Sequence, residues 1–486
     1  MKKATIIIFA LVLGTCSGPP GTLEEILSSG QIRVLTRVSP TTFYRGADGY
    51  EGPEYLLVDG FARFLSDKYD RPIEVHFESA DRFADILPTV EARQTHFAAA
   101  GLTITPERLD RVSFGPSYQE VKQHLVYRIN STKPQNIAAL HGKRLEVVAG
   151  SSYAETLANI QADHPDFTWA ENPNLEINEL LAAVAARQID YTVADSTSFD
   201  VHRNYMPELA IAMNLKESDQ LAWAFRKNNS DAIRADAEEY FATIRASGKL
   251  EQILDRYYGH TDKFDYVGTR IFLRHHDRRL QPYKNLFREA SHHTGADWRL
   301  LAAIGYQESH WDPTAVSPTG VRGLMMLTST TANYMGVSDR EDPHEAIPAG
   351  ARYFAQLRKR LADIPEPDRT WFALAAYNVG YGHVRDAQRI VRMQGGTPNH
   401  WVSVRDALPL LSQHKWYSQV PNGYARGWEP VQYVKNVRTY FEILNWLDPD
   451  EITDYPPDDA LSPPAPDLQI AANEAQPALI KRYLPN

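Results

Sequence analysis

Two carboxylates, Glu308 and Asp312, lie one helical turn apart in the segment YQESHWDPTAVSPTG. Glycosidases normally use such a pair, with one carboxyl group as general acid and a second, roughly 5 to 10 Å away, as nucleophile or base. Pro313 follows Asp312 directly and disfavours helical geometry at the residue before it. We therefore expect the helix to end near Asp312, and we interpret Asp312 as a helix-end or turn residue rather than as the second carboxylate.

A helix that contains Glu308 would also carry apolar residues on the same face. In ADWRLLAAIGYQESHW, Leu301, Ile304 and Glu308 follow one another at spacings of three and four residues. Burial of the two aliphatic side chains would draw the carboxyl group into a low-dielectric environment. Its pKa would rise, and it could then donate a proton near neutrality. On position alone, a half-exposed glutamate at a frayed helix end is the simpler interpretation.

Glu308 begins a series of five short motifs in the C-terminal half of the chain. In order they are ES at Glu308-Ser309, SPTG at 317–320, GLMML at 323–327, AAYNVG at 375–380 and YV at Tyr433-Val434. This series resembles the catalytic core of the soluble-lytic-transglycosylase-like fold, which is related to goose-type lysozyme. Met326 departs from the pattern, because many members carry glutamine there, so a polar sugar contact cannot be inferred from that side chain.

The resemblance implies a role for each matched side chain. Glu308 would be the only catalytic acid and base. Ser317 would orient the N-acetyl group of the substrate, and the Tyr433 hydroxyl would support Glu308. The implied substrate-binding residues are Ser317, Met325, Met326, Tyr377, Asn378 and Tyr433. For the two tyrosines, packing in the core is the alternative.

The implied reaction is the non-hydrolytic cleavage of the β-1,4 bond between N-acetylmuramic acid (MurNAc) and N-acetylglucosamine (GlcNAc) in peptidoglycan. No second acid accompanies the motifs, which suits assistance by the substrate's 2-acetamido group and a 1,6-anhydromuramyl product. Glu308 would first donate a proton and then, as a carboxylate, accept one. Two alternatives stay open: a lysozyme-type hydrolase of the same bond, and a solute-binding sensor with an inactive helical domain.

The N-terminal half has a different organisation, because β-rich runs alternate with amphipathic helical stretches over 22–260. The expected strands are 32–38, 73–79, 96–104, 124–130, 144–150, 190–196 and 221–227. This alternation favours an α/β fold with mostly parallel sheets. The length is large for one sheet, so we expect two lobes, followed by one long helical pattern over 231–259.

Arg108 is the first candidate binding residue of this half. Thr105 is a suitable N-cap and Pro106 suits the first helical position, so Arg108 falls in the first turn of a helix just beyond a strand. Ligands of α/β sheets bind at that edge, where an arginine can hold a carboxylate through two hydrogen bonds. A solvated surface arginine is the alternative.

Residues 30–259 resemble the bacterial extracellular solute-binding proteins, family 3, of the amino-acid type. The resemblance implies a two-lobed periplasmic-binding-protein-like domain in which Arg108 holds a ligand carboxylate and Asp195 the ammonium. Ser151 and Ser152 would add donors at a helix start. The family's glycine-rich entry is altered here to YEGPEYLLVDGF, so an amino acid, a peptide fragment or a degenerate cleft without ligand would all fit. Our hypothesis is that this module senses a cell-wall-derived peptide or amino acid and regulates the enzyme.

Residues 1–21 have the pattern of a secretory signal, in which two lysines precede an apolar stretch too short to span a bilayer. Cys16, the only cysteine of the chain, ends the sequence LGTC, which resembles a bacterial lipobox with an unusual Thr15. We expect Cys16 to be lipidated; the alternative is cleavage that discards it. The predicted location is the periplasmic face of the outer membrane, lipid-anchored or peripheral. The expected partners are the glycan strands and the inner leaflet of that membrane.

Helical patterns dominate 261–450, which we expect to form an all-α, lysozyme-like catalytic domain. Residues 451–486 form a proline-rich, acidic segment that we expect to be a disordered tail. The formal net charge of −10 argues against nucleic-acid binding. The adjacent pairs His275-His276 and His292-His293 lack metal-ligand spacing, and we expect neither a metal nor a cofactor.

Overall fold

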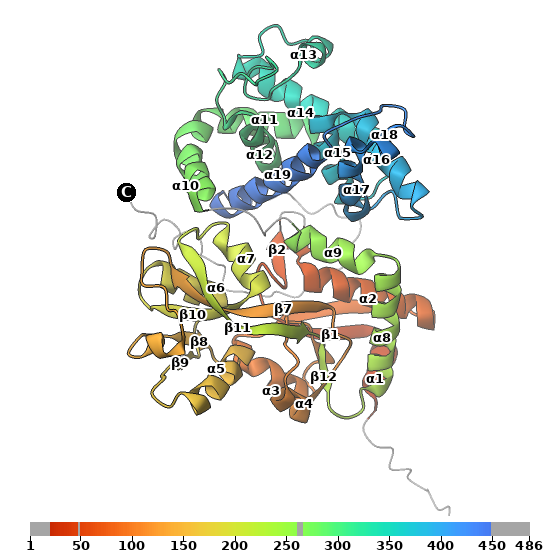
Figure 1. The fold of residues 1–486 in the computed structure, drawn as a ribbon. Helices are drawn as coiled ribbons and strands as arrows, with labels where there is room; N and C mark the ends of the chain where they lie inside the picture. Colours follow the sequence, from red (N-terminus) through yellow and green to blue (C-terminus); the bar gives the residue numbers. More distant parts are fainter. Residues whose placement is uncertain (1–19, 47–48, 260–265, 449–486) are drawn as a thin grey trace, which may run out of the picture.

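The computed structural model describes residues 20–46, 49–259 and 266–448. Figure 1 shows an α/β part, coloured red to green, and a helical part, coloured green to blue, that lies against it. The predicted signal with Cys16 and the predicted tail at 451–486 lie outside the described residues. Within the described ranges, no helix is both long and apolar enough to cross a membrane.

The first lobe is built on a five-stranded sheet with the order β4-β1-β5-β12-β6. Its strands are β1 (Gln31–Thr36), β4 (Glu74–Ser79), β5 (Phe97–Ala98), β6 (Val112–Phe114) and β12 (Ala224–Arg226), with a separate hairpin of β2 (Tyr44–Gly46) and β3 (Gly49–Glu51). Its helices are α1 (Thr22–Ser29), α2 (Pro53–Tyr69), α3 (Ile86–Glu91), α4 (Pro106–Arg111), α8 (Asp231–Ala246) and α9 (Lys249–Tyr258), with a 3-10 turn η1 (Phe83–Asp85). The buried faces of α2, α8 and α9 share one hydrophobic core with the sheet.

The second lobe is built on a three-stranded sheet with the order β10-β7-β11. Its strands are β7 (Gln119–Arg128), β10 (Tyr191–Asp195) and β11 (Leu209–Leu221), with a separate parallel pair of β8 (Glu146–Val148) and β9 (Ala170–Asn172). Its helices are α5 (Ser152–Asp163), α6 (Ile177–Ala185) and α7 (Ser196–Arg203), with a 3-10 turn η2 (Ile137–Leu140). This lobe has its own hydrophobic core, so the α/β part is two-lobed, as expected.

The prediction of mostly parallel sheets was wrong for the second lobe, because β7 pairs antiparallel with both β10 and β11. In the first lobe β1 pairs in parallel with β4 and β5, but β12 is antiparallel to its neighbours. β11 was missed entirely. Register shifts interrupt its pairing with β7, and a bulge breaks the alternation by which a strand is detected in sequence. The strand expected over 96–104 is only the two residues of β5.

The single long helix expected over 231–259 was also wrong, because two helices, α8 and α9, occupy this stretch. Gly248 separates them with a left-handed backbone conformation, φ 72°. Glycine adopts that conformation without steric cost, so the chain can turn there although the helical periodicity continues on both sides. The turn sets the direction of α9, which faces the helical part of the molecule (Figure 1).

The helical part contains α10 to α19. The helices are α10 (Tyr266–His275), α11 (Lys284–Thr294), α12 (Trp298–Ser309), α13 (Ser329–Met335), α14 (Pro343–Arg360), α15 (Asp368–Val379), α16 (Tyr381–Met393), α17 (Trp401–Ala407), α18 (His414–Tyr417) and α19 (Trp428–Leu447). Shorter turns are η3 (His276–Leu280), η4 (Gln281–Tyr283) and η5 (Leu408–Ser412). One large core joins these helices, and α19 packs against both α12 and α15.

The two parts are joined through α19, which lies along their boundary (Figure 1). On the first lobe, Asp255 of α9 accepts from Arg438 of α19, with Nη1 to Oδ2 at 3.0 Å, and from Arg405 of α17, with Nη1 to Oδ1 at 2.6 Å. On the second lobe, the ring of Tyr205 stacks on Trp446 of α19, with centroids 4.6 Å apart. A single helix therefore contacts both lobes.

Candidate functional site

Glu308 lies in the last turn of α12. Leu301 and Ile304, the apolar residues of its helix face, are fully buried, as their spacing predicted. The Glu308 side chain is half-buried and meets Tyr433 of α19, which is 4% exposed. The Tyr433 hydroxyl donates a hydrogen bond of 2.7 Å to Oε1 of Glu308. Packing between α12 and α19 therefore positions the pair.

Burial raises the pKa of Glu308 to about 7, and the hydrogen bond from Tyr433 lowers it in part. Desolvation disfavours the charged form of a carboxyl group, whereas a donor directed at the carboxylate favours it. A pKa near 7 means that both forms are populated at neutral pH. The group can therefore give up a proton and take one back within a single reaction cycle.

The helix ends at Ser309, earlier than Pro313 alone would require. His310 and Trp311 follow with left-handed backbone conformations, φ 54° and 57°. The indole Nε1 of Trp311 donates 2.8 Å to the Ala302 carbonyl, which anchors this bend inside the core. Trp311 is 1% exposed, so packing of its ring holds the chain in the strained turn.

Asp312 is a turn residue in the structure. Its Oδ1 accepts hydrogen bonds from the backbone N–H of Thr314 at 2.9 Å and from the Thr314 hydroxyl at 2.8 Å. These bonds lower the pKa of Asp312, so it is ionised at neutral pH and its charge is directed into its own turn. The pKa is thus raised for Glu308 and lowered for Asp312, because the two acids lie in different environments.

Tyr377, which belongs to α15, lies near Glu308. Its hydroxyl donates 3.0 Å to the Met325 carbonyl, and burial, followed by the nearby charge of Glu308, raises the pKa of Tyr377 well above its usual value. Met325 is buried and packs closely against Gly350 of α14, where a Cβ would lie 2.7 Å from the Met325 Cε. The side chain of Met325 is thus core, and its backbone carbonyl faces the site.

The other residues matched by the motifs are half-buried or exposed. Ser317 is half-buried in a tight turn, where its Oγ accepts from Val321 N–H at 3.0 Å and lies 3.0 Å from the Thr319 hydroxyl. Met326 is half-buried with a left-handed φ of 45°. Asn378 is exposed at the end of α15.

Two features beside the site were not among the residue roles expected from the sequence, although Ser309 belongs to the ES motif. Ser309 donates to the Gly305 carbonyl and, at 2.9 Å, to the Leu324 carbonyl, which ties α12 to the loop that carries the GLMML motif. Tyr353 of α14 packs on Tyr377, with ring centroids 5.3 Å apart. Tyr353 also lines a groove of about 340 Å³ with Thr330, Thr331, Tyr334, Gln356, Leu357 and Arg360. Isolated tyrosines within helices resemble core residues in sequence, so only the fold identifies this groove.

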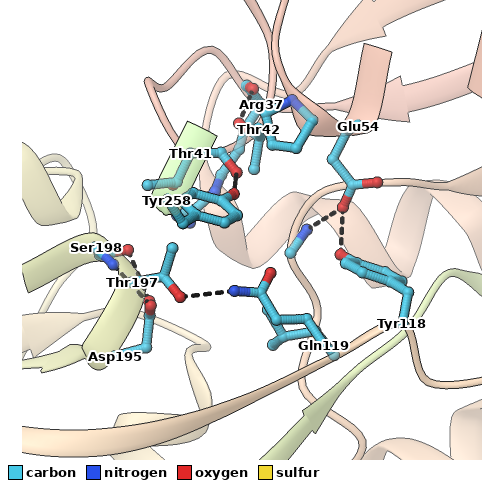
Figure 2. A pocket seen from close by; sticks show the side chains of 13 residues that line it. Arg37, Thr41, Thr42, Glu54, Tyr118, Gln119, Asp195, Thr197, Ser198 and Tyr258 are labelled. Atoms are coloured by element: carbon cyan, nitrogen blue, oxygen red, sulfur yellow. Dashed lines mark hydrogen bonds between the residues drawn. The ribbon is translucent and has the colours of Figure 1, made fainter. Parts of the chain in front are cut away.

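The α/β part contains a second candidate site, a polar cleft at the junction of the lobes (Figure 2). It is lined by Arg37, Thr41, Thr42, Pro53, Glu54, Gly101, Tyr118, Gln119, Asp195, Thr197, Ser198, Leu221 and Tyr258. Its cavity is about 20 Å³, room for about one water molecule. Of the four binding residues expected from sequence, only Asp195 lines this cavity.

Arg108 has the local structure expected, since the Thr105 hydroxyl caps α4 by accepting from Arg108 N–H. It is not a solvated surface arginine, because it is 3% exposed. Its guanidinium donates to the carbonyls of Thr103, at 3.1 Å, and Gly150, at 3.0 Å, and pairs with Glu155 at 3.3 Å. Arg108 thus connects α4 to the second lobe, and each of its nitrogens has a protein partner.

Ser151 and Ser152 lie at the start of α5, as the resemblance implied, and both are buried. The Ser151 hydroxyl donates 2.6 Å to the Val148 carbonyl, and the Ser152 hydroxyl donates 3.2 Å to Oγ1 of Thr103. Asp195 caps α7 and accepts from Ser198 N–H at 2.8 Å. Among the described residues, no group of three or more histidine, cysteine or acidic side chains is placed to hold a metal ion.

Two family models match the chain. Residues 32–260 match the bacterial extracellular solute-binding proteins, family 3, and residues 285–398 match the transglycosylase SLT domain. Membrane-bound lytic murein transglycosylase F 1 of Alkalilimnicola ehrlichii is 44% identical over 452 residues, 91% of this chain and 90% of that protein. Membrane-bound lytic murein transglycosylase F of Stutzerimonas stutzeri is 42% identical over 452 residues, 92% of each chain. The solved structure of an ancestral arginine-binding protein bound to arginine is 20% identical, and its match spans 47% of this chain and 99% of that chain with a TM-score of 0.42.

The fold and the matches define a peptidoglycan lytic transglycosylase that carries an N-terminal solute-binding module. Both resemblances seen in the motifs are thereby confirmed. Three relatives with this name are 39%, 42% and 44% identical to the chain, and each match spans at least 90% of its length. The chain belongs to the membrane-bound lytic murein transglycosylase F family.

Proposed function

We propose that Glu308 is the only catalytic acid and base of this enzyme and that it acts on the MurNAc-β-1,4-GlcNAc bond. The observation that carries the proposal is a half-buried carboxyl group with a pKa of about 7, held by the Tyr433 hydroxyl. Asp312, the acid nearest in sequence, is ionised and bound within its own turn. A single residue with both protonation states accessible suits a cycle that needs an acid and then a base.

In the proposed reaction Glu308 donates one proton and then accepts another. Protonated Glu308 donates its proton to the glycosidic oxygen, the bond from C1 of MurNAc to that oxygen breaks, and GlcNAc leaves with a free 4-hydroxyl. The 2-acetamido oxygen of MurNAc stabilises the positive charge at C1. The Glu308 carboxylate, stabilised by Tyr433, then takes the proton of the C6 hydroxyl, whose oxygen bonds to C1. The product is a 1,6-anhydromuramyl end, formed without water.

The surrounding residues are proposed to hold the glycan strand. Ser317 would orient the acetamido group and Asn378, exposed beside the site, would bind a sugar. Tyr377 and Met326 would form the wall of the site, with the Met325 carbonyl fixing the Tyr377 hydroxyl. Tyr433 would act chiefly through Glu308.

Digestion of purified sacculi tests this proposal. The wild-type protein should release muropeptides whose masses show anhydro ends, and Glu308→Gln should lower the rate by at least about a hundredfold, the loss usual for a general acid. Asp312→Asn is the matched control, because it neutralises an acid one turn away, and it should retain activity within a few-fold. Reducing MurNAc ends would show a hydrolase, and an active Glu308→Gln would refute the assignment.

We further propose that the solute-binding module binds a cell-wall-derived peptide or amino acid and thereby changes the rate of the enzyme. The contacts of α19 support this proposal. Arg438 of α19 binds Asp255 on the first lobe, and Trp446 of α19 stacks on Tyr205 of the second. Movement of one lobe relative to the other must therefore strain one of these contacts. The same helix carries Tyr433, so a shift of α19 would alter the hydrogen bond to Glu308.

The regulatory proposal is tested by adding the muropeptides released in a completed digestion to a fresh reaction. The initial rate of sacculus digestion should change several-fold, in a saturable manner. A rate that is independent of added muropeptides and of free amino acids would refute regulation and would leave the catalytic assignment intact.

We propose that the protein resides at the periplasmic face of the outer membrane, anchored through Cys16 or bound peripherally. The secretory-signal pattern of residues 1–21 and the position of Cys16 after its apolar stretch support this location. Membrane fractionation of wild type and Cys16→Ser tests it, because a lipid-anchored protein should leave the membrane fraction when the cysteine is lost. Unchanged fractionation of Cys16→Ser would favour peripheral binding.

A further inference from the structure

The groove that Tyr353 lines runs between α13 and α14, which pack against each other (Figure 1). At one end of the groove the Tyr353 ring packs on Tyr377, and the pKa of Tyr377 is raised by burial and then by the charge of Glu308. The groove residues of α14 follow the helical repeat and form one stripe on that helix: Tyr353, Gln356, Leu357 and Arg360. The groove therefore begins beside the residues around Glu308 and ends at Arg360.

Arg360 lies seven residues after Tyr353, which places it about 10 Å further along α14 at the helical rise of 1.5 Å per residue. Its side chain is exposed. The guanidinium lies over the Tyr381 ring, 4.0 Å from the ring centroid, and forms no ion pair with a carboxylate of the described residues. The far end of the groove thus carries an unpaired positive charge that a ring holds in place.

The charges around Arg360 do not neutralise it. A second guanidinium, that of Arg385, lies over the same Tyr381 ring, 5.1 Å from its centroid. The nearest acid in sequence, Asp363, pairs with Arg385, with Oδ1 3.2 Å from Nη2. One carboxylate therefore serves two guanidinium groups, and the residues that line the groove include no acid. An anion in the groove would find a partner in Arg360.

The groove can hold more than a single ion. Its volume of about 340 Å³ lies at the lower end of the range for small-molecule sites. Its walls offer hydrogen-bonding side chains and, at Tyr334, a ring that is 72% exposed. Because the guanidinium of Arg360 rests on Tyr381 through one face, its in-plane N–H groups are left to form the fork that matches a carboxylate.

The substrate supplies such a carboxylate beside its sugars. Each MurNAc residue carries a stem peptide on its lactyl group, and the stem has free carboxylates, whereas the ring hydroxyls and acetamido groups of the glycan are neutral. Three extended peptide residues span about 10 Å, which equals the distance along α14 from Tyr353 to Arg360. A stem that enters the groove beside Tyr353 would therefore bring a carboxylate near its third residue to Arg360.

We propose that the groove between α13 and α14 binds the stem peptide of a MurNAc residue held at the active site, with a stem carboxylate on Arg360, and that Arg360 thereby makes the enzyme prefer strands that carry stems. This role rests on the proposed function of Glu308 and adds a determinant of substrate choice. Arg360 lies away from the reacting atoms, so its loss should raise KM and leave kcat unchanged.

Cleavage of three soluble glycan substrates of equal length tests this role. One carries intact stems, one carries stems whose carboxylates have been converted to amides, and one has lost its stems to an amidase. Wild type should have its lowest KM for intact stems. Arg360→Gln should raise that KM about three- to tenfold, as expected for an exposed, charge-assisted contact, and should leave the KM for the other two substrates unchanged.

Two further variants serve as comparisons. Arg360→Lys keeps the charge without the fork, and its KM for intact stems should fall between those of wild type and Arg360→Gln. Lys359→Gln removes the same charge from the next residue of α14, which is exposed and does not line the groove. This variant should match wild type on every substrate.

Three results would overturn the role of Arg360. An unchanged KM for intact stems in Arg360→Gln would show that no stem carboxylate binds there. An equal rise in KM for strands without stems would show that the groove binds sugar or supports the fold. Equal KM values of wild type for intact and amidated stems would show that the stem charge is not recognised. Failure of wild type to cleave any of the three substrates would instead refute the proposed function.

Discussion

Tyr433 donates its hydroxyl to Oε1 of Glu308 across 2.7 Å, although the two residues are 125 positions apart in the chain. Tyr433 is buried within α19, and Glu308 lies in the last turn of α12, where it is half-buried. The pair combines two opposing effects, because burial raises the pKa of Glu308 and the phenol lowers it. The result, a pKa of about 7, depends on helix packing and not on any local motif.

Tyr433→Phe should raise the pKa of Glu308, because it removes the donor that stabilises the carboxylate and leaves the desolvation in place. The proton-donating form would persist to higher pH, and regeneration of the base would become harder. We expect the maximum of the pH–rate profile to move upward and the rate at pH 7 to fall by about tenfold, the cost of one charge-assisted hydrogen bond.

Tyr440→Phe is the control for this variant, because it removes a phenolic oxygen from the same helix. Tyr440 packs on Phe272, with ring centroids 5.0 Å apart, in the core behind the site. Its pH–rate profile should keep the wild-type maximum. Equal shifts in both variants would show that α19 acts only as a structural support.

Glu308→Gln should stabilise the protein above pH 7 while it abolishes activity. The carboxyl pKa is near 4.5 in an unfolded chain and about 7 in the folded protein. Below pH 4.5 both states are protonated and no stability is lost. Between pH 4.5 and pH 7 the carboxyl group is ionised in the unfolded chain before it is ionised in the folded protein. The free energy of unfolding therefore falls as pH rises, by about 3 kcal/mol in total once the group is ionised in both states.

The measurement is the melting temperature of both proteins at pH 5 and pH 8. Glutamine does not titrate, so the advantage of Glu308→Gln over wild type should be larger at pH 8 than at pH 5. Asp312→Asn should differ from wild type by the same amount at pH 5 and pH 8, because the pKa of Asp312 is lowered in the folded state and its stabilising effect is lost only below the unfolded pKa. A pH-independent difference for Glu308→Gln would contradict a raised pKa.

Asp255→Asn should weaken the joint between the solute-binding module and the catalytic domain. Its carboxylate lies between Arg405 and Arg438, and Arg438 is 3% exposed. Loss of one partner of a buried ion pair costs about 3 kcal/mol, since the remaining charge stays desolvated. We expect a lower melting temperature and loss of any response of the digestion rate to added muropeptides.

Glu251→Gln, an exposed acid on the same helix, provides the comparison for Asp255→Asn. A surface change of this kind should alter the free energy of unfolding by less than about 0.5 kcal/mol. Should Asp255→Asn retain both its stability and its response, α9 would not transmit the state of the cleft.

Gly350→Ala should disturb the active site from the opposite side of the core. The added Cβ would lie 2.7 Å from Cε and 3.0 Å from Cβ of Met325, whose carbonyl accepts the Tyr377 hydroxyl. Overpacking of this kind costs about 1 to 3 kcal/mol. Thermal melts should show that loss, and sacculus digestion should slow. An unchanged melting temperature would mean that the Met325 side chain can move aside freely.

Local chemistry let the sequence predict the elements near the site. Spacing predicted that Leu301 and Ile304 would be buried beside Glu308, and Thr105 and Pro106 predicted the start of α4. The order of five motifs predicted the family. Each of these inferences depends on residues that are neighbours along the chain, where backbone geometry links sequence to structure directly.

The sequence did not predict contacts between elements that are distant along the chain. β11 was missed because its register shifts against β7 break the alternation of side chains, and the turn at Gly248 is hidden inside a continuous helical pattern. The cleft shows the same limit. Asp195 was expected there, but Arg37 and Tyr258 reach it from β1 and α9, whose association only the folded lobes establish.

Neighbouring residues in the sequence were enough to indicate which glutamate shares a helix face with apolar residues, that its helix ends before Pro313, and to which family the chain belongs. The tertiary structure alone decided that Glu308 meets Tyr433, that Asp312 is bound within its own turn, and that Arg108 joins the lobes instead of facing the cleft. The physical reason is that a pKa or a free hydrogen-bond donor depends on the solvent and partners around a side chain. Those surroundings come from helices and strands that are distant in sequence.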